Sequence, residues 1–356
     1  MSRMADVSVV IVTLDGRPWI ERCIESVLGA AREVILVDHG SGDGTVALVR
    51  ERFPAVRVIE QGNVGYGAGM NAGMRVAAGE WFLVLNADAW AEQGVAAGGG
   101  AAGAVGATGR ETGGAAALGV HPLDRLVAYS EARPEAAVVG PRLLNPDGTL
   151  QRSVRGFPTV WRLATEYLFL RKLAPRSTAL NGFYAGGFDH ASAREVEWLM
   201  GAVMLVRRAA ADEVGLFDEE FFLFSEETDW CRRFHAAGWQ VWFDPEVAFT
   251  HVGGASHGGR LLRENLRGHL RYFAKHGGSG RAGGAGGAGG SGSAERVRLL
   301  LLWALRLRGA LFPGARGRMC RDAARWLASG SVQELLDAPR DVSQGAPQDV
   351  PQDVPR

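Results

Sequence analysis

Residues 7–38 read VSVVIVTLDGRPWIERCIESVLGAAREVILVD and contain two strand patterns separated by a helical pattern. The first run, Val7 to Thr13, is apolar and rich in β-branched residues, as expected for a strand buried on both faces of a sheet. Apolar residues at helical spacing follow from Ile20 to Leu28, and Val34 to Asp38 is the second strand pattern. This order predicts a strand–helix–strand unit with parallel strands.

The same alternation continues along the chain. Further strand patterns lie at 56–59, 81–85, 137–144, 195–207 and 240–243, and further helical patterns lie at 68–78, 209–214 and 226–237. We therefore expect an α/β fold with a mixed, mostly parallel, Rossmann-like sheet flanked by helices. Ligands of such sheets bind at the carboxyl ends of the strands, where Asp15, Asp38 and Asp88 lie.

Local composition divides the chain into four parts. Glycine and alanine dominate residues 94–120, which predicts a flexible insertion because such a segment has little side chain to bury. We expect the main domain at 1–275 with this insertion inside it, a Gly-rich linker at 276–294, a basic amphipathic helical segment at 295–330, and a disordered tail at 331–356.

The overall composition excludes several classes of protein. Lysine plus arginine and aspartate plus glutamate both number 39, so the net charge gives no support for a nucleic-acid partner. Three cysteines far apart fit neither a disulfide framework nor a zinc site. The start of the chain shows no signal-peptide pattern, and the apolar run 299–305 is shorter than the roughly 20 residues that cross a bilayer. We expect a cytoplasmic protein.

Two residues are candidates for holding a divalent cation. Asp88 follows an apolar strand in the segment LNADA, and a carboxylate there can hold Mg²⁺ or Mn²⁺ beside a diphosphate. A strand-ending aspartate is as often a turn residue. His251 ends the strand-like segment 247–250 and is either a metal ligand or a structural histidine.

Two Gly-rich turns are candidates for nucleotide contacts. Asp38 opens the segment DHGSGDGT, where its carboxylate either accepts hydrogen bonds from a base or ribose or only shapes the turn. The segment GNVGYGAGMN at 62–71 resembles a phosphate-binding loop but lacks the lysine of a P-loop.

The segment SEETD at 225–229 places Glu226, Glu227 and Asp229 in the first turn of a predicted helix, with Ser225 as its N-cap. Acidic residues at this end stabilise a helix through its dipole by about 0.3–1 kcal/mol each. Three carboxylates together, just after an aromatic run, also repel one another, which raises a pKa and suits a general base.

Taken in order, these segments resemble family 2 glycosyltransferases of the GT-A fold, and rhamnosyltransferase-like members in particular. The similar stretches cover most of residues 7–256 outside the insertion; they are VSVVIVTLDGRPWIERCIESVL, VILVDHGSGDGT, GNVGYGAGMNAG, WFLVLNADA, VVGPRLLNPDGTLQ, VEWLMGAVMLVRR and GLFDEEFFLFSEETDWCRRFHAAGWQVWFDPEVAFTHVGGAS.

The resemblance implies roles for particular residues. Asp88 matches the last position of the family's DxD motif and, with His251, would bind Mg²⁺ or Mn²⁺ on the donor diphosphate. Glu227 matches the family's catalytic base. The implied nucleotide-binding residues are Thr13, Asp15, Asp38, Gly65, Asn71 and Asn86, and those implied on the acceptor side are Trp198, Gly201 and Glu226.

Two positions depart from the family pattern. The first position of the DxD motif is Asn86, so one strong carboxylate remains, as in other rhamnosyltransferase-like members. The base position is a glutamate rather than an aspartate, which leaves Glu227 and Asp229 both open as the proton acceptor.

The resemblance implies an inverting glycosyltransferase that moves L-rhamnose from dTDP-rhamnose to a hydroxyl of a polyprenyl-linked or polysaccharide acceptor in cell-envelope synthesis. The arginine- and leucine-rich segment 295–330 would either contact the inner face of the plasma membrane peripherally or pack on the catalytic domain. Alternatives are a UDP- or GDP-sugar donor, a non-catalytic sugar-nucleotide-binding protein, and a nucleotidyltransferase. The last would need a longer basic loop than residues 14–17 provide.

Overall fold

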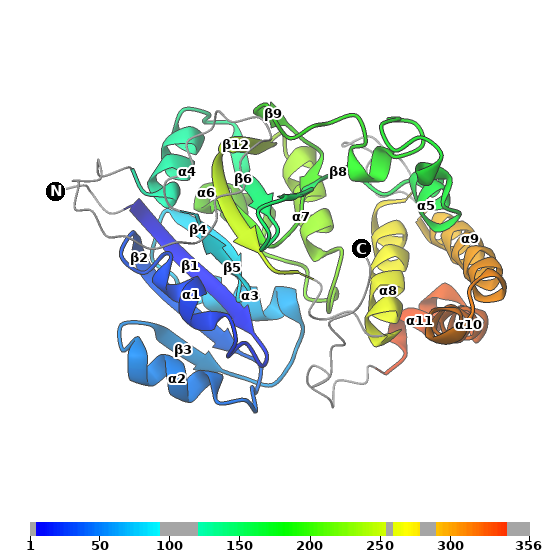
Figure 1. The fold of residues 1–356 in the computed structure, drawn as a ribbon, viewed down its shortest axis with the longest axis horizontal. Coiled ribbons are helices and arrows are strands. Elements are labelled where there is room, and N and C mark those ends of the chain that lie inside the picture. Colours follow the sequence, from blue (N-terminus) through cyan, green and yellow to red (C-terminus); the bar gives the residue numbers. More distant parts are fainter. Residues whose placement is uncertain (1–4, 93–119, 254–258, 278–289, 340–356) are drawn as a thin grey trace.

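The computed structural model describes residues 5–92, 120–253, 259–277 and 290–339 (Figure 1). These residues contain a ten-stranded sheet whose main path runs β3-β2-β1-β4-β11-β6-β12-β5. The strands of this path are β1 Ala5–Thr13, β2 Ala31–Asp38, β3 Arg57–Glu60, β4 Trp81–Asn86, β5 Ala89–Ala91, β6 Ala136–Leu144, β11 Val203–Arg207 and β12 Gln240–His251. Strands β7 (Leu150–Gln151) and β9 (Arg194–Glu195) pair with β6 and β12 at its margins.

Strands β1 to β4 are parallel, and β11 runs antiparallel between β4 and β6. Along β1, Val7, Val9 and Ile11 enter one apolar core, while Val10 enters the core on the opposite face. Both faces of the sheet are therefore covered, as the apolar run predicted. The expected mixed, mostly parallel α/β fold is confirmed.

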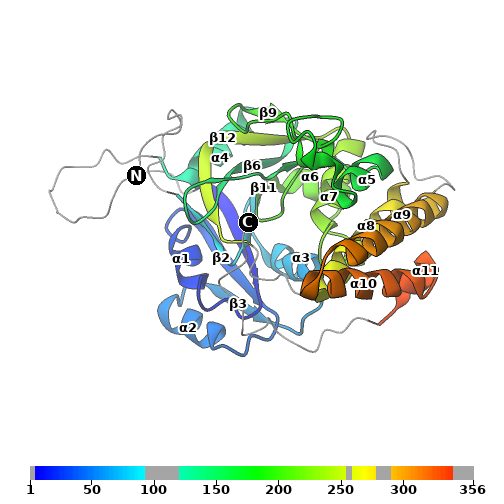
Figure 2. The ribbon, with the colours of Figure 1, turned by 45° about the vertical axis from the view of Figure 1, so that its right-hand side comes forward.

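Helices cover both faces of this sheet (Figures 1 and 2). They are α1 Ile20–Glu25, α2 Thr45–Arg52, α3 Tyr66–Val76, α4 Pro122–Glu131, α6 Arg208–Val214 and α7 Glu226–Ala236. Buried residues of α1 and α4 join the core that contains Val7, and those of α3, α6 and α7 join the core that contains Val10.

The segment 195–207, expected to be one strand, forms three short ones. Besides β9 and β11 it contains β10 (Trp198–Leu199), which pairs antiparallel with β8 (Val154–Arg155) outside the main sheet. The turn at Gly201 and Ala202 separates β10 from β11. A long apolar run cannot reveal such a break, because both short strands are buried and look alike in sequence.

The C-terminal part is a group of helices beside the sheet domain (Figure 2). They are α8 Gly259–His276, α9 Gly290–Leu311, α10 Gly314–Ala328 and α11 Val332–Asp337; α9 contacts α8, α10 and α5 (Val160–Tyr167). Two short 3₁₀ helices, η1 (Leu170–Lys172) and η2 (Gly182–Tyr184), follow α5. None of the described helices is both long and apolar enough to cross a membrane.

Several expected boundaries change. The segment 295–330 is two helices, which meet at Pro313, rather than one. The expected tail at 331–356 starts with α11, which buries Leu335 and Leu336 and has a capping box at Ser331. The rest of that tail from 340, the insertion up to 119 and the central linker residues 278–289 lie outside the described residues.

The carboxylate of Asp229 joins α7 to α8. It lies 2.8 Å from the Arg233 guanidinium, 2.8 Å from the Lys275 ammonium and 2.7 Å from the His276 imidazole. Burial alone would raise the pKa of Asp229, but the hydrogen bond from His276 and the charges of Arg233 and Lys275 lower it to about 2. A carboxylate held this way is a poor proton acceptor, so the geometry argues against Asp229 as the alternative base.

We predict that Asp229→Ala lowers the free energy of unfolding by about 3 kcal/mol, because it removes a buried carboxylate that pairs with Arg233, Lys275 and His276 at once. The folded-state pKa lies below the ordinary 3.8, so the wild-type advantage is present above that pH and is lost as the pH falls towards 2. Chemical denaturation at pH 7 and pH 3 measures both effects.

The matched control is Asp322→Ala, which removes an exposed pair with Arg325 on α10. We expect a change of under about 0.5 kcal/mol there. Equal losses in the two variants would contradict the role given to Asp229.

Candidate active site

The fold brings the strand-end residues to one edge of the sheet. Thr13 pairs with Asp38 across β1 and β2, and Val12 pairs with Asn86 across β1 and β4. Asp88 lies two residues beyond the end of β4. His251 reaches the same region because it ends β12 and pairs with Ala89 of β5.

Asp88 and His251 face one another, with the Asp88 Oδ1 atom 3.4 Å from His251 Nε2. His251 Nδ1 lies 2.6 Å from the Gln151 Oε1 atom, an acceptor, and Asn86 Nδ2, a donor, lies 3.3 Å from Nε2. The Gln151 acceptor assigns a proton to Nδ1. In the neutral ring Nε2 accepts a hydrogen bond from Asn86, and in the protonated ring Nε2 donates to Asp88. Burial would raise the pKa of Asp88, but the hydrogen bond and charge of His251 and the Gly253 N–H lower it overall.

The Asp88–His251 pair fits a cation that takes few protein ligands. No group of three or more His, Cys, Asp or Glu side chains that could hold a metal occurs in the part of the chain that the structure describes. Mg²⁺ and Mn²⁺ do not need such a group, because they commonly use one or two protein ligands and complete the shell with phosphate oxygens and water. A histidine oriented by a neighbouring side chain, as His251 is by Gln151, is typical of metal ligands.

Tyr66, the first residue of α3, connects the two halves of the site. Its hydroxyl lies 2.9 Å from Asn86 Oδ1 and 2.9 Å from the Gly201 carbonyl oxygen. Burial and the charges of Glu226, Glu227 and Asp88 raise the pKa of Tyr66, so three carboxylates surround this hydroxyl. Tyr66 is not predictable as a site residue from the sequence, because only its place after a Gly-rich turn marks it, and such a turn by itself indicates nucleotide binding.

Glu226 and Glu227 begin α7 beside Tyr66. Glu226 is buried and Glu227 half-buried, and each has one buried Oε2 atom without a hydrogen-bond partner. Burial, with repulsion from Glu227, raises the pKa of Glu226 well above its ordinary value. Burial also raises the pKa of Glu227, but main-chain N–H groups and the charge of Arg155 oppose the shift. Glu226 is therefore the group that keeps its proton, and Glu227 is the one that can ionise.

The residues expected on the acceptor side lie around Glu227. A Cβ atom added to Gly201 would be 3.5 Å from the Glu227 Cβ, so the two residues are in contact. Trp198 is buried, and its indole N–H has no hydrogen-bond partner. A buried donor without a partner is costly in the free protein and suits a polar ligand.

The residues expected to bind the nucleotide divide into two groups. Asp38 is buried, and its carboxylate accepts hydrogen bonds from the Gly40 and Ser41 N–H groups and the Ser41 hydroxyl, so this geometry favours the turn-shaping role. Asp15 accepts a hydrogen bond from the Gly42 N–H on the same loop, and Thr13 has a buried hydroxyl without a partner.

The other two expected nucleotide ligands are occupied within the fold. The Asn71 side chain bonds the Phe217 main chain through both its nitrogen and its oxygen, and it also bonds Glu219. Gly65 has a φ of 102°, and a Cβ there would lie 2.6 Å from the Phe222 carbonyl oxygen. These contacts argue against nucleotide binding by Asn71 and Gly65: they fix α3 against the loop that leads to α7.

Known proteins are similar to this chain in sequence and in fold. The family model "Glycosyl transferase family 2" matches residues 8–96. The N-acetylglucosaminyl-diphospho-decaprenol L-rhamnosyltransferase of Mycobacterium tuberculosis is 31% identical over 265 residues, which are 70% of this chain and 76% of that protein. The rhamnosyltransferase WbbL of Escherichia coli strain K12 is 30% identical over 83 residues, 22% of this chain and 31% of that one.

Among solved structures, that of GalNAc-T7 with UDP, GalNAc and Mn²⁺ matches with a TM-score of 0.50 and 14% sequence identity. The match covers 95% of this chain and 57% of that chain. At this identity the likeness concerns the fold alone, and it agrees with the GT-A arrangement expected from the sequence.

We predict that Asp88→Ala abolishes the stabilisation of the protein by dTDP in the presence of Mn²⁺, because the cation loses its carboxylate ligand. Thermal melting with dTDP and either Mn²⁺ or EDTA measures this. Asp6→Ala, which removes a partly exposed carboxylate paired with Arg32, should behave as wild type. A melting shift with dTDP that is the same with Mn²⁺ and with EDTA would rule out a metal at Asp88.

Proposed function

The chain belongs to glycosyltransferase family 2, and on that premise we propose that it is an inverting enzyme that transfers L-rhamnose from dTDP-rhamnose to a sugar hydroxyl on a polyprenyl diphosphate. The name of the M. tuberculosis relative supports this donor sugar and this class of acceptor. One structural observation carries the proposal: Asn86 lies within hydrogen-bonding distance of His251, the Tyr66 hydroxyl lies 2.9 Å from both Asn86 Oδ1 and the Gly201 carbonyl oxygen, and Gly201 contacts Glu227. The candidate cation pair and the candidate base thus share one site.

Glu227 is the proposed general base. It accepts the proton of the attacking hydroxyl as that oxygen bonds to the anomeric carbon and the diphosphate departs on the opposite side. Glu226, which keeps its proton, does not add a second negative charge to the site, and its acid group can donate a hydrogen bond to the acceptor.

Asp88 and His251 would hold Mg²⁺ or Mn²⁺. When bound, such a cation offsets the negative charge that grows on the departing diphosphate. The chain's own contribution is orientation: Gln151 fixes the His251 ring, and Asn86 bonds both His251 and Tyr66. An aspartate at position 86 could not donate a hydrogen bond to His251. This gives the asparagine at the first DxD position a physical role.

Residues 1–275 form the proposed catalytic domain, and α9 with its neighbours forms a proposed contact with the membrane that carries the lipid acceptor. One face of α9 packs on the rest of the protein through Val297, Leu301 and Leu305. Of the two expectations for segment 295–330, membrane contact or packing on the protein, packing is therefore correct for this face. On the other face four apolar residues at intervals of four are exposed by 43%, 66%, 50% and 63%: Leu299, Trp303, Leu307 and Leu311.

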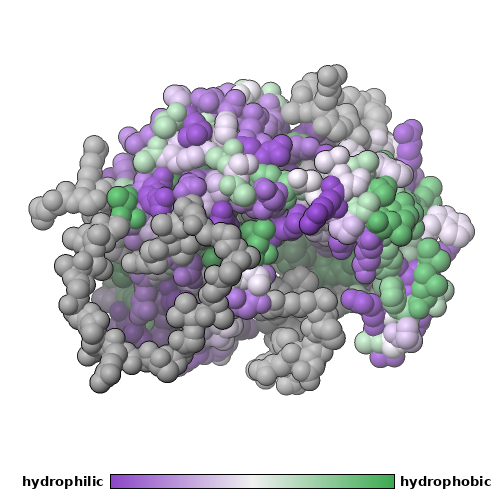
Figure 3. Space-filling model, turned by 45° about the horizontal axis from the view of Figure 1, so that its top comes forward, coloured by the Kyte–Doolittle hydropathy of each residue, from purple (hydrophilic) through white to green (hydrophobic). Residues whose placement is uncertain are grey.

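Charge around this stripe favours an anionic lipid surface. The exposed arginines of α9 and α10 are Arg296, Arg306, Arg316, Arg318, Arg321 and Arg325. Figure 3 shows apolar side chains gathered with polar ones at the end of the molecule where these helices lie. An apolar stripe with tryptophan, flanked by arginines, is the composition of helices that lie in a membrane interface. We place the protein on the cytoplasmic face of the plasma membrane.

We predict that Glu227→Gln lowers the rate of rhamnosyl transfer at least 100-fold, because the acceptor hydroxyl loses its base, while dTDP binding is retained. The assay offers dTDP-rhamnose, UDP-sugars and GDP-sugars in turn with N-acetylglucosaminyl-diphospho-lipid and follows the product by mass spectrometry. Transfer from a UDP- or GDP-sugar in preference to dTDP-rhamnose would overturn the donor assignment, and near wild-type turnover in the variant would overturn the base assignment.

We predict that replacing Leu299, Trp303 and Leu307 together by serine reduces co-sedimentation with phosphatidylglycerol vesicles at least tenfold. Wild type should bind these vesicles better than neutral phosphatidylcholine vesicles. Val64→Ser, which changes an apolar residue that is 50% exposed in the sheet domain, is the control and should bind as wild type. Unchanged binding of the triple variant would refute the membrane contact.

A further inference from the structure

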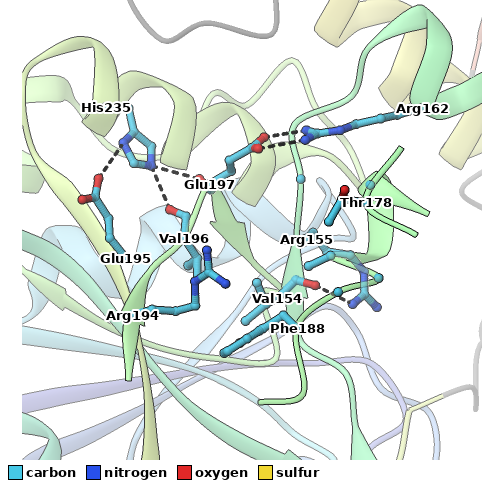
Figure 4. A pocket seen from close by; sticks show the side chains of 15 residues that line it. Val154, Arg155, Arg162, Thr178, Phe188, Arg194, Glu195, Val196, Glu197 and His235 are labelled. Carbon is cyan, nitrogen blue, oxygen red and sulfur yellow. Dashed lines mark hydrogen bonds and ion pairs between the residues drawn. The ribbon is translucent and has the colours of Figure 1, made fainter. Parts of the chain in front are cut away.

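A pocket of about 440 Å³ is lined by Arg155, which pairs with Trp198 of the proposed acceptor side. Figure 4 shows the side chains that line this pocket. The pocket is bounded by β8, by the loop that includes η2, by β9 and by the last turns of α7. The polar side chains that line it include Arg155, Arg162, Arg194, Glu197 and His235. None of the residues assigned above to the donor, the cation or the base lines it.

The cations of this pocket differ in their partners. Arg162 forms two hydrogen bonds to Glu197, at 2.6 and 2.9 Å, so their charges cancel. His235 Nε2 lies 3.1 and 3.0 Å from the main-chain oxygens of Val196 and Glu197. This nitrogen therefore bonds the two residues that join β9 to β10. Arg155 and Arg194 form no ion pair with any carboxylate of the described residues.

Arg155 is held in place although it lacks an anionic partner. Its Nη1 atom donates to the main-chain oxygens of Arg152 and Val154, at 2.6 and 3.1 Å, and its guanidinium lies 4.7 Å from the centre of the Tyr184 ring. Burial lowers the pKa of Arg155, because the guanidinium is largely removed from water. A fixed, planar guanidinium with unused N–H groups is suited to phosphate oxygens.

The position of Arg155 relates the pocket to the reaction. Arg155 pairs with Trp198 across the β8–β10 ladder, and the chain then reaches Gly201, which contacts Glu227. The charge of Arg155 acts on Glu227 directly, since it is one of the groups that oppose the rise in the pKa of Glu227. Arg155 Nη2 also lies 3.5 Å from the sulfur of Met200, which precedes Gly201, so the guanidinium lies near the proposed place of the acceptor sugar.

We propose that this pocket binds the diphosphate group that joins the acceptor sugar to its lipid, and that Arg155 determines the preference for this anionic acceptor. This inference rests on the proposed function, because it assigns one part of the same acceptor. The donor diphosphate belongs at Asp88 and His251, so the enzyme has two separate diphosphate sites. Arg194, which is exposed at the pocket rim, adds a second positive charge.

The test compares two acceptors with the same sugar: N-acetylglucosamine on a diphosphate with a short lipid chain, and a neutral alkyl N-acetylglucosaminide. Wild type should use the diphosphate acceptor with at least tenfold higher kcat/KM. Arg155→Met should lose this preference through a higher KM for the diphosphate acceptor. Loss of the charge that supports Glu227 lowers kcat by the same factor with both acceptors, so the ratio of the two kcat/KM values is the readout. Arg155→Lys should show an intermediate preference.

The control is Arg133→Met, because Arg133 also lies against a tyrosine ring and bonds a main-chain oxygen but is remote from the pocket lining. It should keep the wild-type preference. Equal preference in wild type and Arg155→Met, or no preference in wild type, would overturn the pocket assignment.

Binding of inorganic pyrophosphate in EDTA, measured by calorimetry, tests the pocket without the reaction. Wild type and Asp88→Ala should bind it alike, and Arg155→Met should bind at least tenfold more weakly. Loss in Asp88→Ala with no loss in Arg155→Met would overturn the proposal. If wild type binds pyrophosphate through Arg155 but transfers rhamnose to neither acceptor, the proposed function is wrong and the diphosphate pocket stands.

Discussion

A series of polar contacts from His251 through Asn86 and Tyr66 to Gly201 connects the two halves of the site, with the Tyr66 hydroxyl between two acceptors. It joins strand ends of the parallel half of the sheet to the turn that follows β10, although these segments lie more than 100 residues apart in the chain. This series of contacts also explains why an asparagine suits the first position of the DxD motif, since its amide must both donate and accept.

The three carboxyl groups of the SEETD segment, Glu226, Glu227 and Asp229, have different roles because their surroundings differ. Asp229 turns towards α8 and is neutralised by cations, so it anchors the helix. Glu226 is buried without a cation and keeps its proton, whereas Glu227 has N–H donors and the nearby charge of Arg155 to support ionisation. In the proposal Arg155 also binds the acceptor diphosphate. Binding of that anion would therefore change the pKa of Glu227.

Much of the fold and part of the site follow from sequence alone. Continuous apolar runs that end in polar residues predicted β1, β2 and β4, and with them the positions of Asp38, Asn86 and Asp88. Contacts between distant segments were not predictable in this way. The partners of Asp229 on α8, the bonds of Asn71 to Phe217 and the bridging role of Tyr66 depend on tertiary packing, which leaves no local pattern. The break at Gly201 was hidden because both flanking strands are apolar.

The central claim is that one carboxylate, Glu227, activates the acceptor while the diphosphate leaves from the opposite face of the sugar. Such a displacement has a stereochemical consequence that does not depend on any variant. The anomeric configuration of the transferred rhamnose, determined by NMR on the product made from dTDP-β-L-rhamnose, tests it most directly. The account predicts an α-linked product, formed with inversion; a β-linked product, formed with retention, would contradict it.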